Sequence, residues 1–207
     1  MMFHSAKAIA ALMLALTVSA CGSVETATRN LPLSPLVASA DAPRSVTTRN
    51  YDVWAMNFTT KDGLQVSEGN GYYPFTDVVW RGDPIGDRKA QLGEIFTTAL
   101  QRGMGEGTGG RPVAVEIELI RFHGVTERVL YSIGGNYHIV FAMTVRDART
   151  GEVLEPARRI ETNLASNGGD AVLRDQQMGQ TQKVRVTEFL AVTLRDELTG
   201  PVTLAAR

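Results

Sequence analysis

Cysteine, histidine and long apolar runs are all scarce in this chain of 207 residues. It contains one cysteine and three histidines. A single cysteine cannot form a disulfide within the chain, so stability must come from an apolar core. Zinc sites need three or four ligands at recognisable spacing, and the few histidines and the cysteine show no such spacing. We therefore expect no bound metal and no cofactor.

Positive charge is not in excess either. The sequence has 21 basic and 22 acidic side chains, and its first 20 residues hold one base, Lys7, and no acid. Removing those residues leaves 20 basic and 22 acidic side chains, a formal charge of −2. A nucleic-acid-binding domain presents a clustered basic face, which this composition does not favour. We expect no nucleic acid among the partners.

The longest apolar run lies near the N-terminus, from Ala8 to Ala20. A bilayer-spanning helix needs about 20 apolar residues, so this run is too short to cross a membrane. Lys7 and the terminal amine place positive charge ahead of the run, and small residues close it. This order is typical of a secretory signal, which we assign to residues 1–20.

The only cysteine follows that run directly, in the stretch Val18-Ser19-Ala20-Cys21. This stretch resembles the lipobox of bacterial lipoproteins. The resemblance implies that the signal is cut before Cys21 and that acyl chains such as palmitate tether the mature protein to a membrane. In such lipoproteins an Asp in the place of Gly22 favours the inner membrane, so we expect the periplasmic face of the outer membrane. The alternative is a soluble periplasmic protein with an incidental cysteine.

Residues 21–43 are expected to hold the lipidated cysteine and a linker to the domain. Pro32, Pro35 and Pro43 exclude a continuous helix there. The apolar residues of this linker, which could dock on the domain, are Leu31, Leu33, Leu36 and Val37. The remainder is long enough for one domain with its own core. We assign that domain to residues 44–201 and a C-terminal tail to residues 202–207.

Alternating apolar and polar residues predict four strands. Residues 113–119, 136–147 and 152–164 form a meander of three strands, each bounded by turn residues. Residues 45–58 form the other strand, with apolar side chains on both faces. One face carries Tyr51, Val53 and Ala55, and the other carries Trp54, Met56 and Phe58. This pattern predicts that the strand is buried on both sides.

Two stretches have the apolar stripe of an amphipathic helix. The first begins at Asp83-Pro84, since Asp caps helices and Pro suits their first turn, and ends at Gly103 and Gly105. The second spans residues 180–198 and places Phe189 and Leu190 in the core. The fold class is therefore α+β: a mostly antiparallel sheet of about four strands, with two long amphipathic helices packed on one face.

Several short runs are distinctive as a set. They are Val79-Trp80-Arg81-Gly82-Asp83-Pro84 with Gly86-Asp87-Arg88, Arg121-Phe122-His123, Gly134-Gly135-Asn136-Tyr137-His138, Asp147-Ala148-Arg149-Thr150-Gly151-Glu152 and Gly179-Gln180-Thr181-Gln182-Lys183. Together they resemble an uncharacterised family of alphaproteobacterial lipoproteins over residues 45–201. The order of elements resembles, more loosely, the auxiliary lipoproteins of ABC-type envelope transporters. The first family has no assigned activity, so no functional residue is carried over.

The most distinctive polar cluster is the loop that contains Arg81, Asp83, Asp87 and Arg88. One interpretation is an anion or carboxylate site, because arginine forms bidentate bonds and a helix N-terminus favours negative charge. The other, which we prefer, is a capped helix start with local Arg–Asp pairs.

The second candidate is the glycine-rich segment that holds Tyr72, Tyr73, Phe75 and Trp80. Its aromatic side chains could line a groove for a partner, or they could fold over the sheet as part of the core. The sequence supports both interpretations equally.

No arrangement of polar residues indicates catalysis. His123 and His138 lie in separate segments, and Glu116 and Glu118 fit the solvated face of a strand. We predict a non-enzymatic binding or assembly module, which holds a protein partner or a transport machine at the outer membrane. The alternatives are a periplasmic module that binds a small ligand or an anion, and a hydrolase of envelope polymers.

Overall fold

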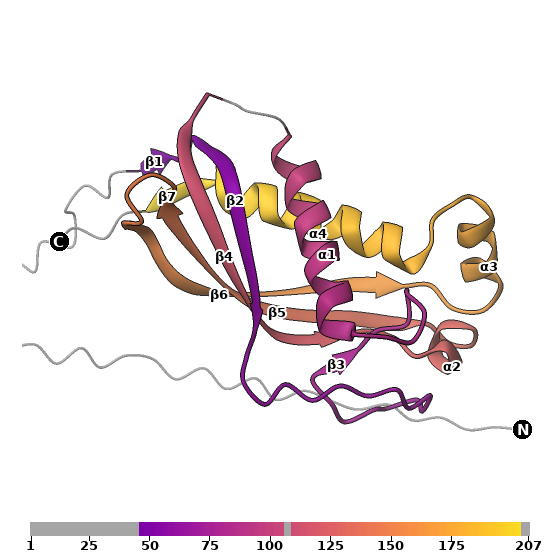
Figure 1. Ribbon diagram of the computed structural model, residues 1–207. Coiled ribbons are helices and arrows are strands. Elements are labelled where there is room, and N and C mark those ends of the chain that lie inside the picture. The colour runs from indigo at the N-terminus through magenta and orange to yellow at the C-terminus, as the bar shows by residue number, and fades with distance from the viewer. Residues whose placement is uncertain (1–45, 106–108, 204–207) are drawn as a thin grey trace, which may run out of the picture. The chain divides into compact units, whose positions relative to one another are not determined.

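The computed structural model describes residues 46–105 and 109–203 (Figure 1). The expected signal of residues 1–20, Cys21 and the linker of residues 21–43 lie outside the described residues. Most of the expected domain of residues 44–201 is described. Its final strand continues through Thr203, two residues into the segment expected to be a tail.

The α+β class is confirmed, and the described residues form a five-stranded sheet and a separate two-stranded one. The larger sheet has the order β2-β4-β5-β6, with β3 paired to β4. Its strands are β2 (Tyr51–Thr60), β3 (Val78–Val79), β4 (Arg111–His123), β5 (Gly135–Asp147) and β6 (Val153–Ser166). The smaller sheet pairs β1 (Val46–Thr48) with β7 (Pro201–Thr203).

The expectation of a mostly antiparallel sheet is only partly right, because the larger sheet is mixed. β4 pairs antiparallel with β5, and β5 with β6, as a meander requires. β2 and β3, however, both pair with β4 in parallel. Helix α1 (Arg88–Met104) lies between β3 and β4 in the chain. It carries the chain back along the sheet, which is the kind of connection that parallel neighbours need.

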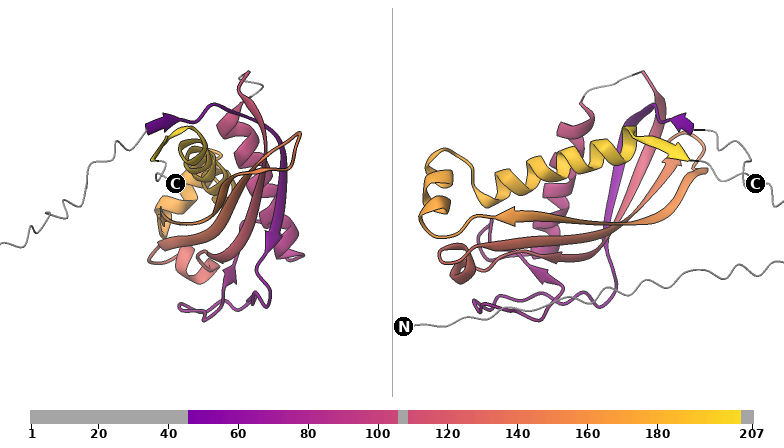
Figure 2. Two further views of the ribbon diagram at one scale, coloured as in Figure 1. Left: turned by 90° about the vertical axis from the view of Figure 1, so that its left-hand side faces the viewer. Right: turned by 180° about the vertical axis from the view of Figure 1, so that it is seen from behind.

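Four helices are found in the described ranges, two more than expected. The two long ones are α1 and α4 (Gln182–Thr199), and the additional short ones are α2 (Glu127–Leu130) and α3 (Asp170–Gln177). Both long helices pack into one apolar core on the same face of the sheet. Figure 2 shows the sheet curving around α4.

The predicted start of the first helix is wrong by one turn. Asp87, and not Asp83, is the N-cap, and its carboxylate accepts hydrogen bonds from the backbone N–H groups of Lys89 and Ala90 at 3.0 and 3.1 Å. The helix ends at Gly105, whose φ of 67° a residue with a side chain rarely adopts. Gly103 therefore lies inside the helix and needs another explanation.

The prediction that the first strand is buried on both faces is also wrong. A β-bulge separates Val53, paired with Val113, from Ala55, paired with Ala114, so that Trp54 is an extra residue. The bulge reverses the alternation. Tyr51 and Val53 before it, and Met56 and Phe58 after it, therefore all pack against the core, as partly buried side chains. Trp54 is 56 % exposed.

The core lies between the sheet and the two long helices. β4 and β5 contribute every second residue of their central parts to it, from Val113 to Leu119 and from Tyr137 to Val145. Phe96 of α1 joins the layers, with its ring centroid 5.4 Å from that of Phe58 and 5.3 Å from that of Phe141. In α4, Leu190 is fully buried, whereas Phe189 is only partly buried against the same core.

The corner where β1 and β7 pair is tied to the main sheet by charged side chains. The guanidinium group of Arg49 donates to both carboxylate oxygens of Glu155, at 2.6 and 2.8 Å, and to the carbonyl of Gly200 at 3.1 Å. The Tyr51 hydroxyl donates to the same carboxylate at 2.8 Å. Partial burial and this bond raise the pKa of Tyr51 to about 12. These contacts hold the first residues of the domain against β6 and the end of α4.

Helices α1 and α4 cross where Gly103 faces the backbone of Ala191. A Cβ atom at Gly103 would lie 2.3 Å from the Ala191 carbonyl oxygen, closer than real Cβ contacts allow. We expect Gly103→Ala to lower the free energy of unfolding by roughly 1–3 kcal/mol, although alanine is the better helix former. Urea denaturation would measure this loss. The control Glu94→Ala, on the exposed face of the same helix, should change it by less than about 0.5 kcal/mol. A Gly103→Ala protein as stable as the wild type would contradict the close crossing.

Candidate functional site

The structure brings Arg81 and Arg88 together around the carboxylate of Glu68, and Arg81 also lies 3.7 Å from that of Glu127. Both arginine side chains are buried, with 4 % and 2 % of their surface exposed. Arg88 pairs with both oxygens of Glu68, at 2.7 and 3.0 Å, and Arg81 lies 3.1 Å from one of them. We call Arg81, Arg88 and Glu68 the arginine clamp. It joins the loop before β3 to the start of α1.

The remaining donors of the arginine clamp point at backbone carbonyl groups and, for Arg88, also at the side-chain oxygen of Gln91, at 2.8 Å. Arg88 donates to the carbonyls of Asp83 and Pro84 at 2.9 and 3.0 Å. Arg81 donates to those of Ser67 and Gly69 at 3.2 and 3.0 Å. Because these bonds and the shared carboxylate satisfy both guanidinium groups, the clamp has the geometry of a structural lock rather than an open anion site.

The two aspartates of the predicted cluster also have structural partners. Asp87 caps α1 as described above. One carboxylate oxygen of Asp83 accepts from the Trp80 indole at 2.8 Å, and the other accepts from Lys183 of α4 at 2.7 Å. Asp83 therefore links the loop to the second long helix, a contact between residues 100 positions apart that spacing alone does not reveal.

The arginine clamp should make stability depend on pH. The hydrogen bond from Arg88 lowers the pKa of Glu68 below its usual range. A group with a depressed folded-state pKa stabilises the fold above its unfolded pKa, and this contribution is lost as the pH falls through the folded pKa. We expect Glu68→Gln to lower the free energy of unfolding at pH 7 by roughly 1–3 kcal/mol, because two buried guanidinium groups lose their carboxylate.

That difference between Glu68→Gln and the wild type should shrink as the pH falls below the ordinary pKa of a glutamate and through the lower pKa of folded Glu68, since the wild-type carboxylate then loses its charge. Urea denaturation from pH 7 to pH 3 would measure it. Glu94→Gln, an exposed carboxylate on α1 without an arginine partner in the described ranges, is the control and should follow the wild type at every pH. A constant difference for Glu68→Gln across this range would contradict the proposed role of its charge.

The aromatic segment divides between the core and the surface. Trp80 is fully buried, and its ring lies edge-on to Phe122 with the centroids 5.6 Å apart. Gly82 is required beneath it, because a Cβ atom there would lie 2.2 Å from the indole ring. Tyr72, Tyr73 and Phe75 are 44 %, 78 % and 98 % exposed. The sequence analysis treated these four side chains together, as either a groove lining or core. In the structure, Trp80 is in the core and the other three are exposed.

The polar groups that acid–base chemistry would use lie apart. His138 and Glu161 form a pair at 2.8 Å on the solvated side of the sheet. His123 has no carboxylate partner among the described residues. Its Nδ1 lies 3.0 Å from the Thr76 carbonyl oxygen, and burial lowers its pKa. Glu116 pairs with Arg146 at 2.9 Å. The described part of the chain contains no cluster of three or more side chains suited to a metal ion.

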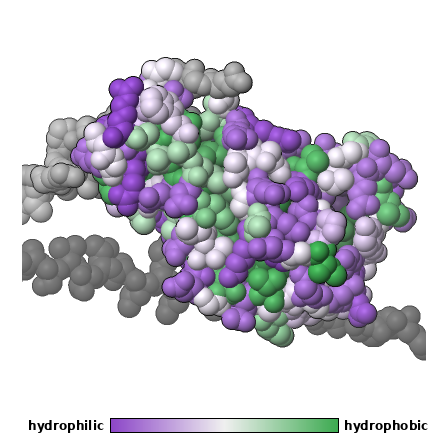
Figure 3. Space-filling model, viewed as in Figure 1, coloured by the Kyte–Doolittle hydropathy of each residue, from purple (hydrophilic) through white to green (hydrophobic). Residues whose placement is uncertain are grey.

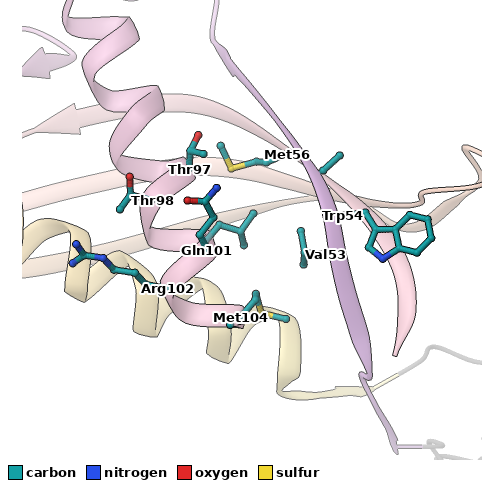
Figure 4. A pocket seen from close by; sticks show the side chains of 11 residues that line it. Val53, Trp54, Met56, Thr97, Thr98, Gln101, Arg102 and Met104 are labelled. Atoms are coloured by element: carbon teal, nitrogen blue, oxygen red, sulfur yellow. The ribbon is translucent and has the colours of Figure 1, made fainter. Parts of the chain in front are cut away.

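A groove that the sequence did not indicate lies between β2 and α1. It has a volume of about 620 Å³. Residues 53–56 of β2 form one wall, and residues 97–105 form the other (Figure 4). Val53 and Met56 point toward α1, while Trp54 projects from the other side of β2. Figure 3 shows a pale green, moderately apolar band between these two elements. We call this feature the β2–α1 groove.

The β2–α1 groove runs beside the open edge of the sheet. Within the described ranges, β2 has a strand partner on one side only, β4. Natural proteins protect such edges with lysine, proline or a bulge. Residues 51–60 contain neither lysine nor proline, and their only charged residue is Asp52, so the bulge at Trp54 is the one protection of this kind. Beyond Trp54, the strand offers an extended backbone next to a helix.

The bulge explains why the sequence did not reveal the groove. Uninterrupted alternation puts Val53 and Met56 on opposite faces, whereas the extra residue brings both toward α1. The signal in the sequence that could have indicated the groove is the presence of apolar residues on both faces of the predicted strand. Such a pattern fits an edge strand with a bulge, whose apolar side chains are only partly covered.

None of the helices in the described ranges combines the length and hydropathy of a membrane span.

Comparison with known proteins gives a family but no activity. Residues 51–207 match the profile described as a family of unknown function, DUF6778. No curated protein matches the chain.

Several solved structures are distantly similar. A Xanthomonas campestris protein of DUF330 is 11 % identical, with a TM-score of 0.40, over 77 % of this chain and 86 % of that one. A Caulobacter crescentus CB15 protein, provisionally described as a lipoprotein, is 14 % identical, with a TM-score of 0.35, over 70 % and 87 %. A minor lipoprotein from Acinetobacter baumannii is 11 % identical, with a TM-score of 0.29, over 55 % and 87 %. At this distance the similarities carry no functional conclusion.

Proposed function

The chain belongs to this family of unknown function, DUF6778, and we propose that it is a lipid-anchored, non-enzymatic binding module of the bacterial cell envelope. Cys21 tethers it to the periplasmic face of the outer membrane. The domain holds an extended, partly apolar segment of a protein partner in the β2–α1 groove. The observation that carries the binding role is this groove beside an unpaired strand edge.

The anchoring part rests on the N-terminal sequence. The only cysteine of the chain follows an apolar run that is too short to span a bilayer, and Val18, Ser19 and Ala20 precede it directly. An unpaired thiol in an exported protein is a chemical liability, and acylation removes it. One acyl chain binds a membrane only marginally, so a stable tether needs more than one, which lipoprotein maturation supplies.

The binding part rests on the chemistry of the β2–α1 groove. An edge strand beside a helix is an arrangement that binds extended peptides by adding them to the sheet. The backbone groups of β2 beyond Trp54 have no second strand partner in the described ranges and would bond the main chain of such a peptide. Val53, Met56 and Met104 offer apolar contacts to its side chains. Arg102 lines the same groove and is exposed, so an acidic residue of the peptide would have a partner. The volume suits a few side chains.

The linker of this chain is a poorer fit than a partner's strand. Its apolar residues alternate with Pro32 and Pro35, and proline cannot donate a backbone hydrogen bond to the edge of a sheet. We therefore take docking of residues 31–37 into the groove as the rival outcome of the experiment below.

The anchor is tested by Cys21→Ala. Without the thiol no acyl chain can be attached, so we expect the variant to leave the membrane fraction and to lose labelling by an alkyne analogue of palmitate. Met13→Leu, a conservative change within the apolar run, should keep both properties. Wild-type protein that fractionates as soluble, or whose intact mass shows no added lipid, would refute the anchor.

The groove is tested by photo-crosslinking in living cells. A benzophenone amino acid is placed at Val53 or Gln101, which line the two walls of the groove, and at Glu188, an exposed position of α4 that does not line it. We expect a covalent adduct with one partner from both groove positions and none from Glu188. Mass spectrometry of the adduct should place the crosslink in an extended apolar segment of that partner.

A groove-filling variant separates specific binding from chance contact. Thr97→Trp, on the α1 wall, should reduce the adduct formed from Gln101 by about tenfold or more, the effect of about 1.4 kcal/mol. Glu94→Trp, one turn earlier on the same helix and outside the groove, should leave it unchanged. Adducts of equal yield from Glu188, no adduct at all, or an adduct with residues 31–37 of the chain itself would each rule out a partner in the groove.

A further inference from the structure

A second hollow, separate from the β2–α1 groove, lies on the opposite face of the sheet and has a volume of about 270 Å³. The turn of residues 61–64 forms one side of it. Asp77, the neighbouring Ile120 and Arg121 of β4, and Arg159 of β6 complete the lining. The side chain of Phe122 is in the core, so that of Arg121, the preceding residue on the strand, points away from the two long helices.

Arg121 is partly buried, and it differs in its contacts from the other buried or partly buried arginines of the described residues. The others have a carboxylate or a carbonyl partner, and this includes Arg158, whose Nε is also unbonded but whose other nitrogens contact Glu197. Arg121 has no hydrogen bond, ion pair or ring contact within the described ranges. Its Nε atom is buried and without a partner. Buried polar atoms are nearly always bonded, so an unpaired one calls for a partner that the described residues do not supply.

The other charges of the hollow do not neutralise Arg121. The carboxylate of Asp77 accepts from the backbone N–H of Gln65 at 3.0 Å, and Arg159 lies 3.3 Å from Glu161. Lys61 and Asp62 come from the turn itself. Three bases and two acids line the hollow, and Glu161 lies beside Arg159. The guanidinium of Arg121 is a positive charge that has no carboxylate within ion-pair distance in the described ranges.

We propose that this hollow binds a phosphate group, carried by a soluble molecule or by a lipid headgroup. A guanidinium group can pair with two phosphate oxygens at once, and this leaves the other oxygens for Lys61 and Arg159. The volume admits one such group with its immediate attachment, and it is smaller than the clefts that enclose whole drug-sized ligands. The run Arg121-Phe122-His123, distinctive in the sequence, thus combines a ligand side chain with a core side chain.

Thermal unfolding with inorganic phosphate tests the site, at an ionic strength held constant with sodium chloride. A ligand that binds only the folded state stabilises it. We expect the wild-type melting temperature to rise by about 3–5 °C at ten times the dissociation constant. Arg121→Gln should abolish the rise. Arg146→Gln, on the same face of the sheet but paired with Glu116, should retain it.

The ligand-free proteins give an independent readout. Removing an uncompensated charge from a partly buried place should leave the melting temperature of Arg121→Gln equal to that of the wild type or higher. The two melting curves should then separate or cross when phosphate is added. A lower ligand-free melting temperature for Arg121→Gln, together with an equal phosphate response in all three proteins, would show that Arg121 is structural and would overturn the site.

The source of the phosphate is decided by a second titration with a short-chain phospholipid kept below its micelle concentration. If dihexanoyl phosphatidylglycerol raises the melting temperature at a lower concentration than inorganic phosphate does, and only when Arg121 is present, the ligand is a lipid headgroup. A response to inorganic phosphate alone identifies a soluble ligand. No Arg121-dependent response to either probe overturns the proposal, and none of these results bears on the β2–α1 groove.

Discussion

Two long helices must share one face of a narrow, curved sheet, and the rest of the fold follows from that constraint. They can do so only because α1 and α4 approach to backbone contact at Gly103, where no side chain fits. α4 takes the concave centre of the sheet, and α1 is therefore placed beside the edge strand β2. The position of α1 determines the β2–α1 groove, because its C-terminal half forms one wall of that hollow. The arginine clamp and the contact of Asp83 with Lys183 fasten the start of α1 in the same arrangement.

The two faces of the sheet consequently present different chemistry. The helix-covered face holds the aromatic core and, at its margin, a hollow with methionine and valine side chains. The uncovered face carries paired charges such as Glu116 with Arg146 and His138 with Glu161, and among them the unpaired guanidinium of Arg121. A module of this kind can contact a protein segment with one face and an anionic group with the other, because the strands of one sheet separate the two places. Neither contact requires catalytic groups.

Local patterns predicted much of the fold, and contacts between distant residues account for most of what they missed. The alternation in β4 and β5 and the apolar stripes of α1 and α4 were sufficient to place the core, including Leu190. The parallel pairing of β2 with β4, by contrast, depends on where α1 returns the chain, which no local pattern specifies. The bulge at Trp54 shifts the alternation of β2 by one residue, so every side chain after it lies on the opposite face from the one that the sequence pattern predicts. Asp83 looked like a helix cap from its neighbours, but its partners are an indole three residues away and a lysine on another helix.

The pairing of β1 with β7 determines how mechanical force would enter the domain. Any tension applied to the chain before Val46 reaches β1 first, where the register with β7 and the bonds of Arg49 to Glu155 and Gly200 resist it. These contacts lie in series with the chain, whereas β4, β5 and the two long helices lie beyond them. Force applied to the chain before Val46 therefore acts first on the β1–β7 pair and the contacts of Arg49, which can separate before force reaches β4 and β5. If the domain is tethered through Cys21 as proposed, this corner would open first, and β4, β5 and the two long helices would keep their arrangement.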